Sequence, residues 1–183
     1  MSQNLLTKFE NLRPGFGDFI PGVLPAAVVA IGQFMAISAV DANTNERTFA
    51  LATGQCDGVM VRNSRVGTGL TDKELLLGIP EVDGDGEIAT PYPTSGQGTI
   101  QPLPLEAIYE GASCIDIAGA DAVLAASAVD TELTIKAGKL ALAVATDLVL
   151  YKIRKQLTVT DTTVAALEQV RIQIYKVNGY KKA

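Results

Sequence analysis

Residues 28–63, VVAIGQFMAISAVDANTNERTFALATGQCDGVMVRN, decide the fold class of this chain. Within this stretch, β-branched and aromatic residues gather in three short runs, which the segments 41–46 and 54–58 separate. β-branched and aromatic residues favour a half-buried pleated sheet, whereas Asn, Asp and Gly favour turns. The stretch therefore predicts three strands joined by two short connections.

The C-terminal part of the chain shows the same kind of pattern. Residues 132–146, ELTIKAGKLALAVAT, divide at 137–138 as a β-hairpin does. Residues 147–160 and 169–177 are the two clearest strands. In the second of them, apolar side chains alternate with polar ones. The sequence thus predicts an all-β protein. Two segments stay ambiguous between loop and short helix: 118–130 and 161–169.

Residues 64–104 interrupt the strand pattern. The part from 78 to 104 reads GIPEVDGDGEIATPYPTSGQGTIQPLP, which holds too much glycine and proline for a core sheet throughout. We expect a long Gly/Pro-rich excursion from the domain, with one or two short strands near 87–90 and 99–101.

Residues 1–22 are expected to form an extended N-terminal arm, followed by one β-rich domain at 23–183. The arm contains LRPGFGDFIPG, in which glycine and proline exclude a continuing helix and aromatic residues recur at Phe16 and Phe19. Apolar side chains on an arm need a surface that buries them. That surface belongs either to the protein's own domain or to a neighbouring subunit, and the sequence leaves both open.

The composition disfavours catalysis. The chain has no histidine, no tryptophan and two cysteines, whereas metal hydrolysis and nucleophilic catalysis usually recruit an imidazole. Cys56 and Cys114 lack metal-ligand spacing and are interpreted as small buried side chains. The acidic turn at 83–87 fails the calcium-loop register, because Ile88 stands where that loop needs glycine, and calcium binding there stays open. We expect a structural or binding protein with no cofactor, not an enzyme.

The sequence shows no targeting or membrane segment. No apolar run reaches the ~18 residues of a membrane span. The first residues, MSQNLLTKFENLRPG, lack the basic region, apolar core and cleavage site of a signal peptide. We therefore expect a protein that is made in the cytoplasm and does not bind membranes.

Charge is distributed unevenly along the chain. Residues 1–149 hold 8 Lys and Arg against 18 Asp and Glu, a net charge of −10, whereas residues 150–183 hold 7 against 2, a net charge of +5. A basic segment on an acidic body could dock on an acidic partner. The alternative is that basic side chains line the wet face of a sheet. These are Lys152, Arg154, Lys155, Arg171 and Lys176. Aromatic residues are too sparse there to predict nucleic-acid binding.

Residues 32–63 resemble the opening of the small phage capsid decoration proteins, also called cement or head-stabilising proteins. In this family a glycine turn leads into an apolar strand, and a polar loop is followed by a strand pair of the type ALATxGxxDGV. An xGA turn, an xxxGKL hairpin and a closing strand come later. Here these are YEGAS at 109–113, IKAGKLALA at 135–143 and VRIQIYKVNGY at 170–180. The resemblance covers roughly residues 23–63 and 105–180.

The resemblance implies a compact β-barrel or β-tulip domain that binds the outer surface of a phage head. It also implies the major capsid protein as partner, a location in the virion and, often, a homo-trimer at three-fold or quasi-three-fold positions. The segments 1–22 and 64–104 depart from the shorter members of the family. They leave the oligomeric state and the docking mode open.

Candidate contact residues follow from this resemblance and from the chemistry of the side chains. An apolar anchor set and a basic guide set are expected to touch the capsid or a neighbouring subunit. They are Phe16, Phe19 and Ile20 for the first set, and Lys152, Arg154 and Lys155 for the second. Two alternatives stay open: another structural β-subunit of the virion, such as a tail or head–tail connector protein, and a ligand-binding barrel or unrecognised hydrolase.

Overall fold

The structure is a computed structural model that describes residues 9–25, 29, 31–63, 97–111, 114–116, 129–158 and 171–183. Within these residues the chain is all-β, as the sequence predicts, with eleven strands and no helix. The strands are β1 (Phe9–Arg13), β2 (Ile20–Val23), β3 (Phe34–Val40), β4 (Arg47–Leu51), β5 (Gly58–Asn63), β6 (Gln97–Gln101), β7 (Glu106–Glu110), β8 (Glu132–Lys136), β9 (Lys139–Leu142), β10 (Leu148–Thr158) and β11 (Arg171–Lys181).

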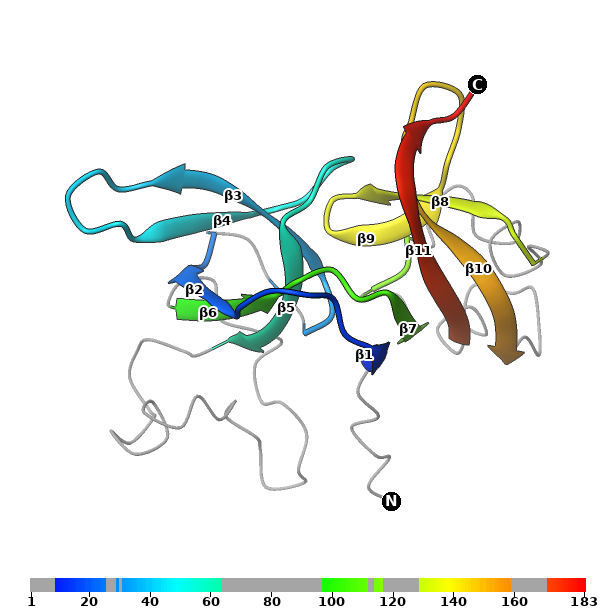
Figure 1. Cartoon of the computed structure of the whole chain (residues 1–183), viewed down its shortest axis with the longest axis horizontal. Coiled ribbons are helices and arrows are strands. Elements are labelled where there is room, and N and C mark those ends of the chain that lie inside the picture. Colours follow the sequence, from blue (N-terminus) through cyan, green and yellow to red (C-terminus); the bar gives the residue numbers. More distant parts are fainter. Residues whose placement is uncertain are drawn as a thin grey trace, which may run out of the picture.

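Five strands close into a barrel in the order β2-β4-β3-β5-β6, on the left of Figure 1. Strands β3 and β4 form the predicted hairpin around the turn at 41–46, and β5 pairs with the other side of β3. Strand β2 closes the ring, because it pairs antiparallel with β6 and parallel with β4. Closure leaves these strands without a long free edge.

The other six strands form an antiparallel sheet in the order β1-β7-β11-β10-β8-β9. Its longest strands, β10 and β11, make the twisted ribbon on the right of Figure 1. One face of this sheet packs against the barrel, and the other carries charged side chains. One hydrophobic cluster therefore lies between the barrel and the sheet, and a second lies among the barrel strands.

Strands β3 and β5 serve two cores at once. Phe34 and Val59 are buried with side chains of the six-stranded sheet, whereas the next residues, Met35 and Met60, are buried among side chains of the barrel strands. Successive side chains of a strand point to opposite faces, so a strand covered on both faces reads as a continuous apolar run. This explains why these runs lack polar alternation.

Backbone hydrogen bonds fasten the β8–β9 hairpin to the barrel. Ala137 and Gly138 both have positive φ, 46° and 76°, as a two-residue hairpin turn of the primed type requires. The Gly138 carbonyl accepts a hydrogen bond from the Phe34 N–H, and the Gly138 N–H donates one to the Ala52 carbonyl, both at 2.8 Å. A Cβ at Gly138 would lie 2.8 Å from Cδ2 of Leu51. The division predicted at 137–138 is confirmed, and its glycine also allows this close contact.

The interpretation of 1–22 as an arm is corrected for its described residues. Strand β1 pairs with β7, and β2 is a barrel strand in which Ile20 lies opposite Ile100. Glycine misleads here, because Gly22 marks close packing inside the barrel: a Cβ would lie 2.6 Å from the Arg47 carbonyl oxygen and 2.7 Å from the Phe49 ring. The protein's own sheets thus take up both strands, and residues 1–8 lie outside the described part.

The expected excursion also needs correction at its C-terminal end. The short strand predicted near 99–101 is confirmed as β6, but β6 is an integral barrel strand, with Ile100 fully buried. A Cβ at Gly98 would lie 2.6 Å from Cδ2 of Leu24, so glycine again marks a close approach within the barrel. The strand expected near 87–90 and the acidic turn at 83–87 lie outside the described residues.

Candidate interaction surface

The connection between β1 and β2 presents two exposed aromatic side chains. Phe16 is 92% exposed and Phe19 is 64% exposed. The connection is held at both ends, because β1 belongs to the six-stranded sheet and β2 to the barrel. Large apolar side chains exposed together on a well-held segment are typical of a binding site.

Two glycines allow this loop to pack closely against the β6–β7 connection. A Cβ at Gly15 would clash with the Leu103 carbonyl oxygen, and a Cβ at Gly17, where φ is 132°, would lie 3.1 Å from Cγ of Pro102. The backbone on both sides of Phe16 therefore lies directly against the β6–β7 connection. The aromatic ring has no room on that side, so it projects into solvent.

An open depression of about 310 Å³ lies beside Phe16. It sits where the barrel meets the sheet, and one acidic and one basic side chain reach it. Its lining residues are Gly15, Phe16, Asp57, Pro102, Leu103, Leu105 and Lys176. The surface formed by Phe16, Phe19 and this depression is called the Phe16 surface below.

The two charges of the Phe16 surface come from different parts of the fold. Asp57 ends the β4–β5 connection, and its Oδ2 accepts a hydrogen bond of 2.7 Å from the Ile37 N–H. Lys176 lies on β11, where its backbone N–H donates to the Leu105 carbonyl at 2.9 Å. Within the described residues, the ammonium of Lys176 makes no ion pair. The depression therefore offers a partner an anionic and a cationic group.

The third predicted anchor, Ile20, is not part of this surface. It lies on β2 and packs, half-buried, against the barrel core. Strand geometry turns it away from Phe19, because successive side chains of an extended chain point to opposite sides. Phe16 and Phe19 are thus both exposed on the β1–β2 connection, whereas Ile20 packs into the fold.

The predicted basic contacts lie on the outer face of the six-stranded sheet. Lys152 faces Glu132 on β8 at 3.9 Å, and the Nε of Arg154 lies 2.9 Å from Glu106 on β7. Exposed Lys155 follows them on β10. Cross-strand pairing of the first two residues favours the sheet-face interpretation of the basic segment. A role of these three residues in binding a partner stays a prediction.

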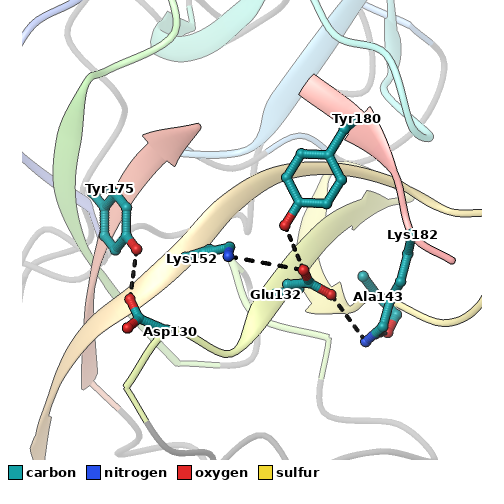
Figure 2. A network of polar contacts seen from close by, with 7 residues as sticks. All are labelled: Asp130, Glu132, Ala143, Lys152, Tyr175, Tyr180 and Lys182. Atoms are coloured by element: carbon teal, nitrogen blue, oxygen red, sulfur yellow. Dashed lines mark hydrogen bonds and ion pairs between the residues drawn. The ribbon is translucent and has the colours of Figure 1, made fainter. Parts of the chain in front are cut away.

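A polar cluster joins the C-terminal strand to this face (Figure 2). The Tyr180 hydroxyl donates to the Glu132 carboxylate, which also lies 3.4 Å from Nζ of Lys182. Lys182 in turn donates to the Ala143 carbonyl at 2.8 Å, and the Tyr175 hydroxyl donates to Asp130 at 2.6 Å. The cluster fixes the end of the chain against β8 and the β9–β10 connection.

Glu132 makes the stability of this cluster dependent on pH. The hydrogen bond from Tyr180, together with Lys182 and Lys152, holds the pKa of the Glu132 carboxyl below its ordinary value. A carboxyl with a lowered folded-state pKa stabilises the fold above its unfolded pKa, about 4.3, and this contribution disappears as pH falls through the folded-state value.

We therefore expect Glu132→Gln to lower the melting temperature at pH 7, and the difference from the unsubstituted chain to shrink as pH falls below about 4. Thermal unfolding across this pH range measures the effect, and Glu46→Gln in the exposed turn between β3 and β4, which makes the same change in charge, is the matched control. A difference that stays constant across the range would show that the ionised carboxylate of Glu132 does not stabilise the fold.

The cysteines are buried free thiols, as predicted. Burial, and to a smaller extent the Asp57 charge, raises the pKa of Cys56 to about 12, so this thiol stays protonated at neutral pH. Among the residues that the structure describes, no group of three or more Cys, Asp and Glu is placed to hold a metal ion. The same residues include no helix with the length and apolarity needed to cross a membrane.

Sequence reasoning found the exposed aromatics but not the depression beside them. Asp57 was not singled out, because a lone acid before a strand gives no signal of its own. The GFG at 15–17 did carry information, since an aromatic residue between two glycines fits a backbone that packs closely while the ring projects. No protein-family model matches the chain, and neither a curated protein nor a solved structure is significantly similar to it. The resemblance to decoration proteins thus rests on sequence motifs.

Proposed function

We propose that this chain is a capsid decoration protein, which binds the outer surface of a phage head and stabilises it by bridging neighbouring capsid subunits. The observation that carries the proposal is the Phe16 surface, where two exposed aromatic side chains stand on a loop whose glycines pack against the β6–β7 connection. The sequence motifs that resemble decoration proteins and the compact β-barrel support it. The proposed partners are the major capsid protein and other copies of this chain.

The physical basis is burial of aromatic surface on a prepared site. Aromatic side chains dominate many protein interfaces, and full burial of a Phe side chain contributes about 1.5–3 kcal/mol. A loop whose two ends are fixed in sheets loses less conformational entropy on docking than a free segment does. Contacts of modest strength then suffice, because a protein that bridges several subunits gains avidity across the shell.

The proposal is tested by sedimentation of the full chain with phage heads that lack it. We expect saturable binding, at a fixed ratio to the major capsid protein. The variant Val144→Ala is expected to bind heads as the unsubstituted chain does. Val144 is also an exposed apolar residue, at 57%, but it lies on the β9–β10 connection and not on the Phe16 surface. Failure to bind heads, or binding to purified tails alone, would contradict the proposal. Deletion of 1–22 is unsuitable as a test, because it removes β1 and most of β2.

A further inference from the structure

The Phe16 surface combines a projecting group and a recess on one patch. Phe16 stands at the rim of the depression with its ring exposed. The depression measures about 310 Å³, about twice the ~150 Å³ cavity that holds a benzene molecule in an engineered protein core. One phenyl ring therefore fits the recess with room for neighbouring atoms.

The charges of the depression are complementary to each other. Asp57 and Lys176 both line it, and within the described residues they form no ion pair with one another. A two-fold axis that passes between Asp57 and Lys176 would place Asp57 of one copy opposite Lys176 of the second, and the reverse on the other side of the axis. Such a contact would form two Asp57–Lys176 ion pairs, one on each side of the axis.

The position of Phe16 at the rim of the depression suits two-fold symmetry between two copies. A two-fold contact uses the same patch on both copies, so that residue i touches residue j and residue j touches residue i. A ring of three copies needs two different patches on each copy instead. A projecting ring at the rim of the recess that can receive it suits the two-fold arrangement.

We propose that free copies of this chain pair about a two-fold axis, with Phe16 of each copy seated in the depression of the other and Asp57–Lys176 ion pairs across the axis. The pairing does not depend on the decoration role. If both hold, they compete, because a Phe16 surface covered by a second copy cannot at the same time contact a capsid.

Analytical ultracentrifugation of the full chain, with no capsid present, tests the pairing. We expect a monomer–dimer equilibrium that shifts with protein concentration. Phe16→Ala is expected to weaken dimerisation at least about tenfold, because it removes the buried aromatic anchor. The matched control, Val144→Ala, is expected to leave it unchanged. A monomer at every concentration, a trimer, or a dimer that Phe16→Ala does not weaken would overturn the proposal.

Charge reversal tests the orientation of the two copies. Lys176→Glu and Asp57→Lys each place like charges opposite one another in a homodimer, so each variant alone is expected to be mainly monomeric. An equimolar mixture of the two variants restores both attractive pairs and is expected to form a heterodimer. If Asp57→Lys fails to fold, Lys176→Glu with added salt replaces it, and salt is expected to reduce the repulsion. No heterodimer in the mixture of folded variants, or no salt effect, would contradict the ion pairs.

These experiments separate the pairing from the decoration role. A chain that binds heads but stays monomeric would lose only the pairing. A chain that dimerises through Phe16 but never binds heads would lose only the decoration role.

Discussion

Replacement of Phe34 with alanine is expected to lower the free energy of unfolding by about 3–5 kcal/mol. Phe34 is fully buried where the barrel meets the six-stranded sheet. The centre of its ring lies 5.4 Å from the ring centre of Tyr109 and 5.6 Å from that of Tyr151. The substitution would leave a cavity at the junction that these rigid neighbours cannot fill. Such a loss is a large part of the 5–15 kcal/mol that typically stabilises a domain.

Urea denaturation measures this effect. Phe34→Leu, which keeps most of the buried volume, is expected to lose much less, and the surface control Val144→Ala is expected to stay within about 0.5 kcal/mol of the unsubstituted chain. A loss below about 1 kcal/mol for Phe34→Ala would show that this ring does not join barrel and sheet in the way described.

Replacement of Phe16 and Phe19 with alanine together is expected to weaken binding to phage heads by about 30-fold or more. Aromatic residues at the centre of an interface typically contribute about 2 kcal/mol or more, and 1.4 kcal/mol corresponds to a factor of ten in affinity. The free energy of unfolding should change little, because both side chains are mainly exposed in the free protein.

Sedimentation with heads, repeated over a range of protein concentrations, gives the affinities. Ile20→Val is a useful comparison, since Ile20 lies on the barrel side of β2 and the change should affect stability slightly and binding not at all. Unchanged affinity of the Phe16/Phe19 double variant would remove these residues as anchors. A loss of affinity in Lys155→Ala instead would move the contact to the basic strand.

The strand content could be predicted from local sequence because each signal lay within one strand pair. The runs that became β3, β4 and β5 are dense in β-branched and aromatic residues, and Ala137–Gly138 marks a turn on its own. Alternation in β11 placed Ile172 and Ile174 in the core, where both are fully buried. Such signals need no knowledge of distant partners.

The division into a closed barrel and a second sheet could not be predicted, since it depends on pairing between distant segments. Strand β2 pairs with β6, and β1 pairs with β7. Gly22 made β2 look like part of an arm, and Gly98 lay in a segment predicted to leave the domain, although both glycines are needed where the barrel packs tightly. Local composition cannot distinguish a glycine that bends the chain from one that admits a neighbour.

The candidate surface shows the same limit. Phe16 and Phe19 stood out because aromatic residues in a Gly/Pro-rich segment lack local partners. Ile20 was grouped with them, but the pleat of β2 turns it toward the barrel core. Asp57 comes from the β4–β5 connection and Lys176 from β11, so only the folded chain places them in one depression.

The proposed decoration role is tested most directly by the copy number of this chain in purified phage virions, determined by quantitative mass spectrometry against the major capsid protein. A decoration role predicts a ratio near one to one. A ratio of a few per cent would place the chain in the tail or at a vertex, and its absence from virions would contradict the proposed function.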